Sequence, residues 1–159
     1  MVLAVGAPAP GFSLRDQHGQ EVTLSSFRGH RAVLVVFYPF AFSGVCTGEL
    51  TGFRDRLGDF ETADSTLVAI SCDPVFAIRA CADRDAVFFP LLSDFWPHGE
   101  VTSAGGVLDE RTGAPRRSSY VVDKEGAVRW SLHNDPGRAR DLDEQAARLA
   151  EVARTGRVA

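Results

Sequence analysis

The feature that most constrains the fold is a run of apolar residues from Ala32 to Tyr38, rich in β-branched side chains. A run of this length and composition is typical of a strand that is buried on both faces of a sheet. Pro39 ends the run, because proline has no N–H to donate to a neighbouring strand. The sequence therefore predicts a central buried strand that stops at Pro39.

A helix is predicted to begin directly after this strand, at about 44–57, and to stop near Gly58. Ser43 is a favourable N-cap residue, which places Cys46 in the first turn. The apolar residues that follow are spaced by four, three and four positions and share a face with Cys46: Leu50, Phe53 and Leu57. Cys46 is therefore expected to face the interior, just beyond the end of the central strand.

A cysteine in the first turn of a helix is placed for chemistry. The backbone N–H groups of Val45 and Cys46 have no intrahelical partners there and carry the positive end of the helix dipole, which stabilises a thiolate over a thiol. Cys46 takes the position that a capping box gives to an acid, so we expect its sulfur within reach of the Ser43 hydroxyl. The alternative is a small buried hydrophobic residue. The aromatic, proline-containing loop before it favours a site, since open α/β sheets bind ligands at the carboxyl ends of strands.

The residues P-F-A-F-S-G-V-C at 39–46 resemble the active-site signature of the peroxiredoxins, which is Pro, three residues, Thr or Ser, two residues, Cys. Pro39, Ser43 and Cys46 fill these positions. This segment together with F-P-L-L-S-D-F-W-P-H-G at 89–99 is similar to the alkyl hydroperoxide reductase E type of peroxiredoxin. The resemblance covers nearly the whole chain. This resemblance implies a thioredoxin-like fold and a peroxidatic cysteine.

Length, charge and cysteine content exclude several classes of protein. A chain of 159 residues suffices for one domain, 1–159, with a real core. The net charge of −4, with no basic run, argues against a nucleic-acid partner. The start has no basic region and no apolar run could span a bilayer, so we expect neither a signal peptide nor a membrane protein. Three cysteines are too few for a disulfide scaffold, which favours the cytoplasm.

The remaining segments predict an α/β sandwich with a mixed central sheet flanked by helices. In order, we expect an N-terminal β-hairpin at 12–24, a helical turn at 25–29, a strand at 66–71, a helix at 74–84 capped by Asp73, a strand at 89–92, a short helix at 99–104, a hairpin at 120–130 and a closing helix that opens at Asp141.

A thiolate that reduces a peroxide needs stabilisation of negative charge, and arginine supplies it best because its charge is permanent and its donors are forked. The resemblance points to Arg117, which leads into the predicted strand at 120–122. Its neighbour Arg116 is the alternative and is expected to be a solvated loop residue. By the same resemblance Glu49, one turn beyond Cys46, would orient the arginine; it would otherwise be a surface carboxylate.

Other reactive side chains are given lesser roles. Cys72 follows a buried strand and is expected to be packed and inert. Cys81 is expected beside the Ile78–Ala82 stripe rather than within it, hence at a boundary of the buried face of its helix. A second catalytic cysteine departs from the resemblance, so Cys81 is kept as a candidate resolving residue. His98 is expected to bond locally, while Phe95 and Trp96 could line a pocket, a dimer interface or the core. The cysteines and histidines have no metal-ligand spacing, so we predict no metal.

The resemblance, together with the position of Cys46, implies a thiol peroxidase that reduces hydrogen peroxide and organic hydroperoxides without a cofactor. Cys46 would pass through a sulfenic acid that an external thiol resolves. The reductant would be a thiol or a thioredoxin- or glutaredoxin-like protein, with a mycothiol or mycoredoxin type as one alternative, and the resemblance implies a homodimer. Resolution by Cys81 is one alternative function. A thiol–disulfide oxidoreductase is a second alternative, which is disfavoured because Glu49 occupies the position of its second cysteine. A non-enzymatic binding module of the same fold is the third alternative.

Overall fold

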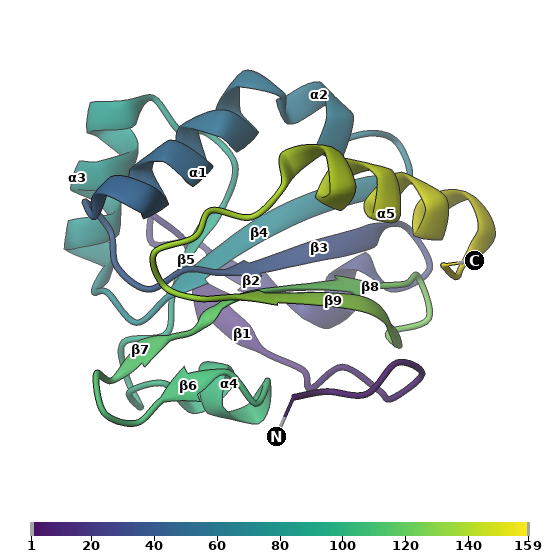
Figure 1. Ribbon diagram of the computed structural model, residues 1–159, viewed down its shortest axis with the longest axis horizontal. Helices are drawn as coiled ribbons and strands as arrows, with labels where there is room; N and C mark the ends of the chain where they lie inside the picture. Colours follow the sequence, from purple (N-terminus) through teal and green to yellow (C-terminus); the bar gives the residue numbers. More distant parts are fainter. Residues whose placement is uncertain (1, 159) are drawn as a thin grey trace.

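The computed structural model describes residues 2–158, and its centre is a seven-stranded sheet in the order β2–β1–β5–β4–β3–β8–β9 (Figure 1). Its strands are β1 (Ser13–Arg15), β2 (Glu21–Thr23), β3 (Ala32–Phe37), β4 (Ser65–Ser71), β5 (Leu91–Ser93), β8 (Arg117–Val122) and β9 (Val128–Asn134). A separate two-stranded sheet consists of β6 (Leu108–Asp109) and β7 (Ala114–Pro115). The helices are the 3₁₀ helix η1 (Leu24–Phe27), α1 (Gly44–Asp55), α2 (Leu57–Phe60), α3 (Val75–Asp85), α4 (Glu100–Ala104) and α5 (Leu142–Thr155).

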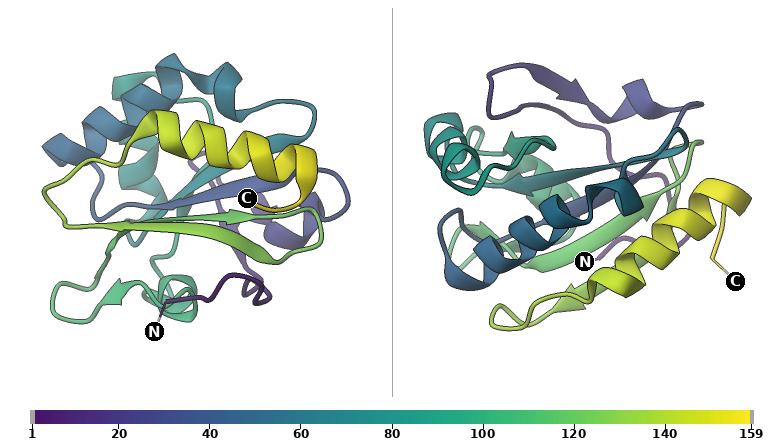
Figure 2. Two further views of the ribbon diagram at one scale, coloured as in Figure 1. Left: turned by 45° about the vertical axis from the view of Figure 1, so that its right-hand side comes forward. Right: turned by 90° about the horizontal axis from the view of Figure 1, so that it is seen from above.

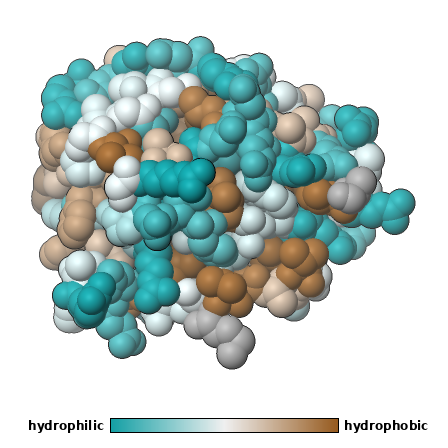
Figure 3. Space-filling view, in the orientation of Figure 1, coloured by the Kyte–Doolittle hydropathy of each residue, from teal (hydrophilic) through white to brown (hydrophobic). Residues whose placement is uncertain are grey.

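Helices cover both faces of the central sheet, but unequally. Figures 1 and 2 show α1, α2, α3 and α5 over one face, with α1 and α5 side by side. The opposite face is covered by the N-terminal segment, α4 and the β6–β7 sheet. The side of the molecule shown in Figure 3 is mostly hydrophilic, with moderately apolar residues at its left margin over α3 and the most hydrophobic residues along its lower edge. The predicted α/β, thioredoxin-like architecture with a mixed central sheet is confirmed.

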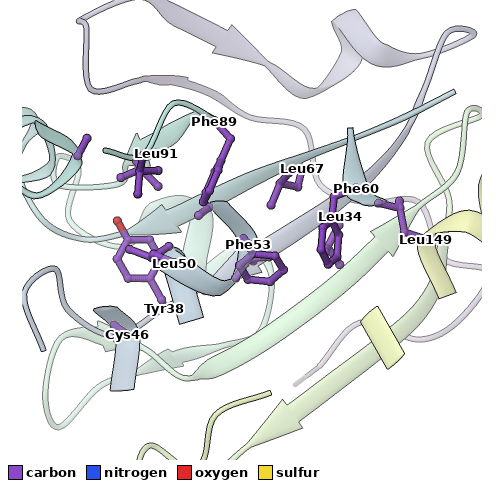
Figure 4. Close-up of a cluster of buried hydrophobic side chains, with 14 of the residues drawn as sticks. Leu34, Tyr38, Cys46, Leu50, Phe53, Phe60, Leu67, Phe89, Leu91 and Leu149 are labelled. Atoms are coloured by element: carbon purple, nitrogen blue, oxygen red, sulfur yellow. The ribbon is translucent and has the colours of Figure 1, made fainter. Parts of the chain in front are cut away.

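The apolar run after residue 31 forms β3, and all six residues of this strand are buried. Its side chains alternate between two cores, as the period of a strand requires. Leu34 and Val36 face the helices with α1, α3 and α5, whereas Val35 and Phe37 face the opposite core. Figure 4 shows the helix-side cluster, in which Cys46 lies at one end. A central strand buried on both faces fixes the registers of its neighbours, because a one-residue slip would exchange the two cores.

The register around β3 determines what meets at its carboxyl end. β3 is parallel to β4 and antiparallel to β8, and Phe37 pairs with Ile70 on one side and Ser118 on the other. The end of β3 is therefore beside the start of β8, so Arg117 lies next to the point at which the chain leaves the sheet for α1. Two segments that are 71 residues apart in sequence are thus brought together.

Several predicted elements are confirmed. β1 and β2 form the N-terminal hairpin, and β8 and β9 pair antiparallel around the turn that follows Val122. The closing helix is capped as predicted, because the Asp141 carboxylate accepts a hydrogen bond from the N–H of Glu144 at 3.0 Å.

Other predicted boundaries are wrong for identifiable reasons. α1 stops at Asp55 because Arg56 leaves the helical region, with φ −120° and ψ 26°, and α2 begins after it. Pro74, not Asp73, is the N-cap of α3, and the Asp73 carboxylate binds the loop before α1 instead. Strand β8 begins three residues earlier than expected, and β5 two residues later. The β6–β7 sheet was not predicted, since strands of two residues leave no periodic pattern.

Candidate active site

The start of α1 presents free backbone donors around Cys46. Ser43 is the N-cap, with extended backbone at φ −71° and ψ 150°, and the first intrahelical hydrogen bond runs from Thr47 N to Ser43 O at 2.9 Å. Among the described residues, the N–H groups of Val45 and Cys46 have no hydrogen-bond partner. Cys46 itself is completely buried, beside Tyr38 and Leu50 (Figure 4). A thiol in this position meets the positive end of the helix dipole away from water.

The guanidinium of Arg117 faces the Cys46 sulfur. Its Nη1 and Nη2 atoms lie 3.6 Å and 3.5 Å from Sγ, and the residue is only 2% exposed. The other donor directions are also used: Nε and Nη2 donate to the carbonyl oxygen of Pro136 at 2.9 Å and 2.7 Å, and Nη1 donates to Glu49. Since the fork of five N–H groups is rigid, these contacts fix the orientation of the charge toward the sulfur.

Glu49 lies one turn after Cys46 and is 5% exposed, between two arginines. Its Oε1 atom binds Arg117 and also accepts from Nη2 of Arg140 at 2.9 Å. Its Oε2 atom accepts from the backbone N and from Nε of Arg140 at 2.8 Å and 2.9 Å. Arg140 in turn donates to the carbonyl oxygen of Phe37, the last residue of β3, at 2.7 Å. One carboxylate therefore joins α1, the start of β8 and the loop before α5.

The formal charges of Arg117, Arg140 and Glu49 determine the electrostatic environment of the Cys46 sulfur. With Arg117 alone, the Glu49 carboxylate would cancel the nearby positive charge. Arg140, which is 4% exposed, supplies a second buried cation and satisfies most of the carboxylate's acceptor positions. Two arginines and one glutamate leave one positive charge in excess, and the Arg117 guanidinium directs it toward the Cys46 sulfur. Because buried charges are costly unless they are paired, the excess positive charge makes the space beside Arg117 favourable for an anionic group.

Glu49 is held ionised by the same contacts. Burial acts to raise the pKa of Glu49, but the hydrogen bonds and charge of Arg140, with the charge of Arg117, outweigh burial and lower that pKa below its ordinary value. A carboxylate that stays ionised can keep both guanidinium groups in place at every pH above its lowered pKa.

The other predicted site residues are placed as follows. Pro39 lies two residues after the end of β3 and is half-buried. The side chain of Ser43 makes no capping hydrogen bond, so the expected Ser43–Cys46 contact is not formed; the sulfur faces Arg117 instead. Arg116 is exposed, and its backbone N–H binds the carbonyl oxygen of Val107. His98 bonds locally, with Nε2 2.6 Å from the Gly113 oxygen.

The two other cysteines lie apart from this cluster. Cys72 is buried, with its sulfur 3.8 Å from the Thr102 hydroxyl, and burial raises the pKa of its thiol to about 11. The prediction that Cys81 lies at a boundary is wrong, because it is buried in the helix-side core. Burial raises the pKa of Cys81 too, and the nearby N–H of Phe42 opposes this effect. All three thiols are free in the structure.

Arg140 is the residue that the sequence did not reveal. It lies in an irregular segment between β9 and α5 and belongs to no repeating pattern. Within residues 2–158, no three His, Cys, Asp or Glu side chains gather as a metal site would require, and no helix is long and apolar enough to cross a membrane.

Comparison with known proteins identifies the family. The model of the AhpC/TSA family matches residues 5–131, which is most of the chain. The chain belongs to the AhpC/TSA family. Alkyl hydroperoxide reductase E of Mycobacterium tuberculosis is 49% identical over 140 residues, which cover 88% of this chain and 92% of that protein.

Solved structures of family members have the same fold. The crystal structure of Enterococcus faecalis AhpC has a TM-score of 0.86 at 27% identity and covers 100% of this chain and 99% of that one. Peroxidoxin BcpB from Mycobacterium tuberculosis has a TM-score of 0.80 at 29% identity, with 97% and 98% covered. The predicted relation to the alkyl hydroperoxide reductase E type of peroxiredoxin, and with it the class of thiol peroxidase, is confirmed.

The lowered pKa of Glu49 gives this AhpC/TSA family member a testable dependence of stability on pH. The unfolded chain takes up this proton first, so the stabilisation is complete above the ordinary pKa of about 4.5 and is lost as pH falls through the lower folded value. In Glu49→Gln we expect the free energy of unfolding at pH 7 to fall by about 3–5 kcal/mol, because two buried guanidinium groups lose their counter-charge.

The difference between wild type and Glu49→Gln should then shrink below pH 4.5, as measured by urea unfolding at a series of pH values. Glu110→Gln, at an exposed position, is the matched control and should change stability by less than about 0.5 kcal/mol. Stability curves for wild type and Glu49→Gln that run parallel over the whole pH range would contradict the charge balance described here.

Proposed function

We propose that this protein reduces hydrogen peroxide and organic hydroperoxides with Cys46 as the peroxidatic nucleophile. The observation that carries the proposal is the Arg117 guanidinium, which lies 3.5 Å from the Cys46 sulfur at the start of a helix. The name of the mycobacterial relative, alkyl hydroperoxide reductase E, supports the substrate class. The fully buried sulfur also implies that substrate enters after a small displacement of the flanking loops.

The proposed reaction begins with attack of the thiolate on the terminal peroxide oxygen. A sulfur–oxygen bond forms while the oxygen–oxygen bond breaks, leaving Cys46 as a sulfenic acid and the other oxygen as hydroxide or alkoxide, which takes up a proton to become water or alcohol. Arg117 and the N–H groups of Val45 and Cys46 stabilise the thiolate and the charge that develops on the leaving oxygen. Pro39 and Ser43 shape the loop, and Glu49 orients Arg117.

Replacement of the nucleophile tests the proposal directly. Cys46→Ser should abolish peroxide consumption by the reduced protein and leave the fold intact, because the hydroxyl is nearly isosteric but scarcely ionised. Cys72→Ser is the control and should keep its activity, since that sulfur lies apart from the arginine cluster. Undiminished turnover in Cys46→Ser would end the hypothesis.

The two adjacent arginines provide a matched pair for the electrostatics. Arg117→Met keeps much of the apolar stem and removes the charge, and should slow the peroxide step by roughly two to three orders of magnitude, the scale of losing one transition-state donor. Arg116→Met should have little effect, because that side chain is exposed. Single-turnover peroxide consumption measures both variants, and equal losses would show that the role belongs to neither residue specifically.

An external thiol is the proposed resolving agent. Its sulfur displaces water from the sulfenic acid to form a mixed disulfide, and a second thiol then releases reduced Cys46. Burial of both Cys46 and Cys81 supports this choice, because an internal disulfide would require displacement of α1 or α3. Oxidation to a neutral sulfenic acid removes the charge that balances Arg117, which favours opening of the first turn of α1 to the resolving thiol.

One equivalent of peroxide, added to reduced protein without any other thiol, distinguishes the mechanisms. We expect a persistent sulfenic acid on Cys46, detected by mass spectrometry after trapping with a 1,3-diketone, with two thiols still free. Cys81→Ser should give the same product at the same rate. Prompt loss of two thiols and a cross-linked Cys46–Cys81 peptide would instead establish the two-cysteine alternative.

The partners follow from the same proposal. The reductant is a low-molecular-weight thiol or a thioredoxin- or glutaredoxin-like protein, of the mycothiol or mycoredoxin type as one alternative, and the three free thiols favour a reducing compartment such as the cytoplasm. A homodimer is supported by exposed aromatic side chains, Phe76 at 88% and Trp96 at 83%, which with Phe95 line a surface hollow beside β1. Their exposure excludes the core position considered for Trp96.

A thiol–disulfide oxidoreductase remains disfavoured. Such an enzyme needs a second thiol three residues after the first. The residue there is Glu49, which forms ion pairs with two arginines.

A further inference from the structure

The loop 39–43, which joins β3 to α1, is anchored by a residue outside the active-site signature. The Asp73 Oδ2 atom accepts a hydrogen bond from the N–H of Ala41 at 2.8 Å. Within the loop, the turn bond from Ser43 N to the carbonyl oxygen of Phe40 is much longer, at 3.4 Å. A hydrogen bond to a charged acceptor is shorter and stronger than one between neutral groups. Asp73 therefore holds the loop at Ala41, while the N–H of the next residue, Phe42, lies beside the Cys81 thiol.

Asp73 is itself fixed to the sheet. It lies two residues after the end of β4, and its carbonyl oxygen accepts a hydrogen bond from the Ser93 hydroxyl of β5 at 2.6 Å. Its backbone N–H lies 3.3 Å from the Ser71 hydroxyl. The anchor thus transmits the position of two core strands to the loop, rather than that of a mobile surface segment.

The residue that follows Ala41 in the loop has a strained backbone. Phe42 has φ 69°, in the left-handed region that a phenylalanine seldom adopts. Its ring lies under the guanidinium of Arg84, 4.8 Å from the ring centroid, and Arg84 also donates to the Thr47 hydroxyl at 3.2 Å. Such a conformation persists only where the surroundings hold it on both sides. Here Asp73 holds the preceding residue, and the N-cap Ser43 follows.

We propose that Asp73 is a positioning residue for Cys46. By fixing Ala41, it holds Phe42 in its left-handed conformation and so sets the direction in which Ser43 opens α1. That direction determines how the Cys46 sulfur meets the Arg117 guanidinium and the first-turn N–H groups. Asp73 acts through the loop; its catalytic consequence rests on the proposed function, but its effect on the reactivity of the Cys46 thiol does not.

The test compares Asp73→Ala, which removes the acceptor, with Asp73→Asn, whose side-chain oxygen can still accept from Ala41. Asp83→Ala is the control, because Asp83 is an exposed carboxylate on α3 that pairs with Arg79. The first readout is the pH at which Cys46 in reduced protein is half-maximally reactive toward iodoacetamide, followed on the Cys46 peptide by mass spectrometry. The second is the single-turnover rate with hydrogen peroxide.

In Asp73→Ala we expect the half-reactive pH of Cys46 to rise by about one unit, which is a tenfold change in the ionisation constant of the thiol. The peroxide step should slow by about ten- to a hundredfold, the scale of a displacement near 1 Å. Asp73→Asn should restore most of both values, and Asp83→Ala should match wild type. A purely structural role would lower thermal stability without moving the half-reactive pH.

An unchanged half-reactive pH in folded Asp73→Ala would overturn the proposal, and so would Asp73→Asn behaving like Asp73→Ala. Should Asp73→Ala fail to fold, amide hydrogen exchange in wild type decides: the Ala41 amide must exchange more slowly than that of Phe40, and equal rates overturn the anchor. Wild-type protein that shows the expected thiol reactivity but consumes no peroxide would refute the proposed function while leaving the positioning role intact.

Discussion

The arrangement around Cys46 depends on a buried carboxylate that is shared by two buried arginines. Isolated, any one of these three charges would be too costly to bury. Together they leave a single positive charge, which Arg117 directs at the sulfur. This excess charge depends on Arg140, which pairs with the Glu49 carboxylate. Without Arg140, the carboxylate would neutralise the charge of Arg117. The active-site charge is therefore a property of the whole cluster rather than of the arginine that contacts the sulfur.

The fold supplies this cluster from three distant segments. The antiparallel register of β3 and β8 places Arg117 beside the end of β3, where α1 begins. The chain after β9 then returns across the same edge, so that Pro136 accepts from Arg117 and Arg140 reaches Glu49. No single segment could build the site alone. The buried strand β3, which fixes its neighbours in register through both cores, is consequently as important to the chemistry as the helix that carries the cysteine.

Sequence reasoning succeeded where a local pattern reflected a local physical requirement. The apolar run of β3, the helix start before Cys46 and the cap at Asp141 are patterns of this kind. It failed where a residue's role depends on tertiary contacts. The residues around Arg140 form no pattern from which a buried cation could be predicted. Asp73 was misassigned because Asp-Pro is a common start of a helix, whereas its carboxylate is used by a loop that lies 32 residues earlier. For Cys81 the prediction of a boundary position is wrong because helical periodicity cannot show which elements pack beside the apolar stripe and bury its neighbours.

The sequence of α1 explains why so many contacts converge on its first turn. Glycine at positions 44, 48 and 52 and two threonines give this helix a low intrinsic propensity, so that packing rather than propensity must stabilise it. Farther along, Leu50 and Phe53 are buried, and Gly52 permits α5 to approach so closely that a Cβ there would lie 2.7 Å from Leu142. The first turn has no comparable apolar anchor beyond Cys46 itself. Its order rests on polar contacts made by Glu49, which binds Arg117 and Arg140, and by the loop before it, which binds Asp73. The turn that carries Cys46 therefore depends on the buried charge cluster and on the preceding loop more than on apolar packing.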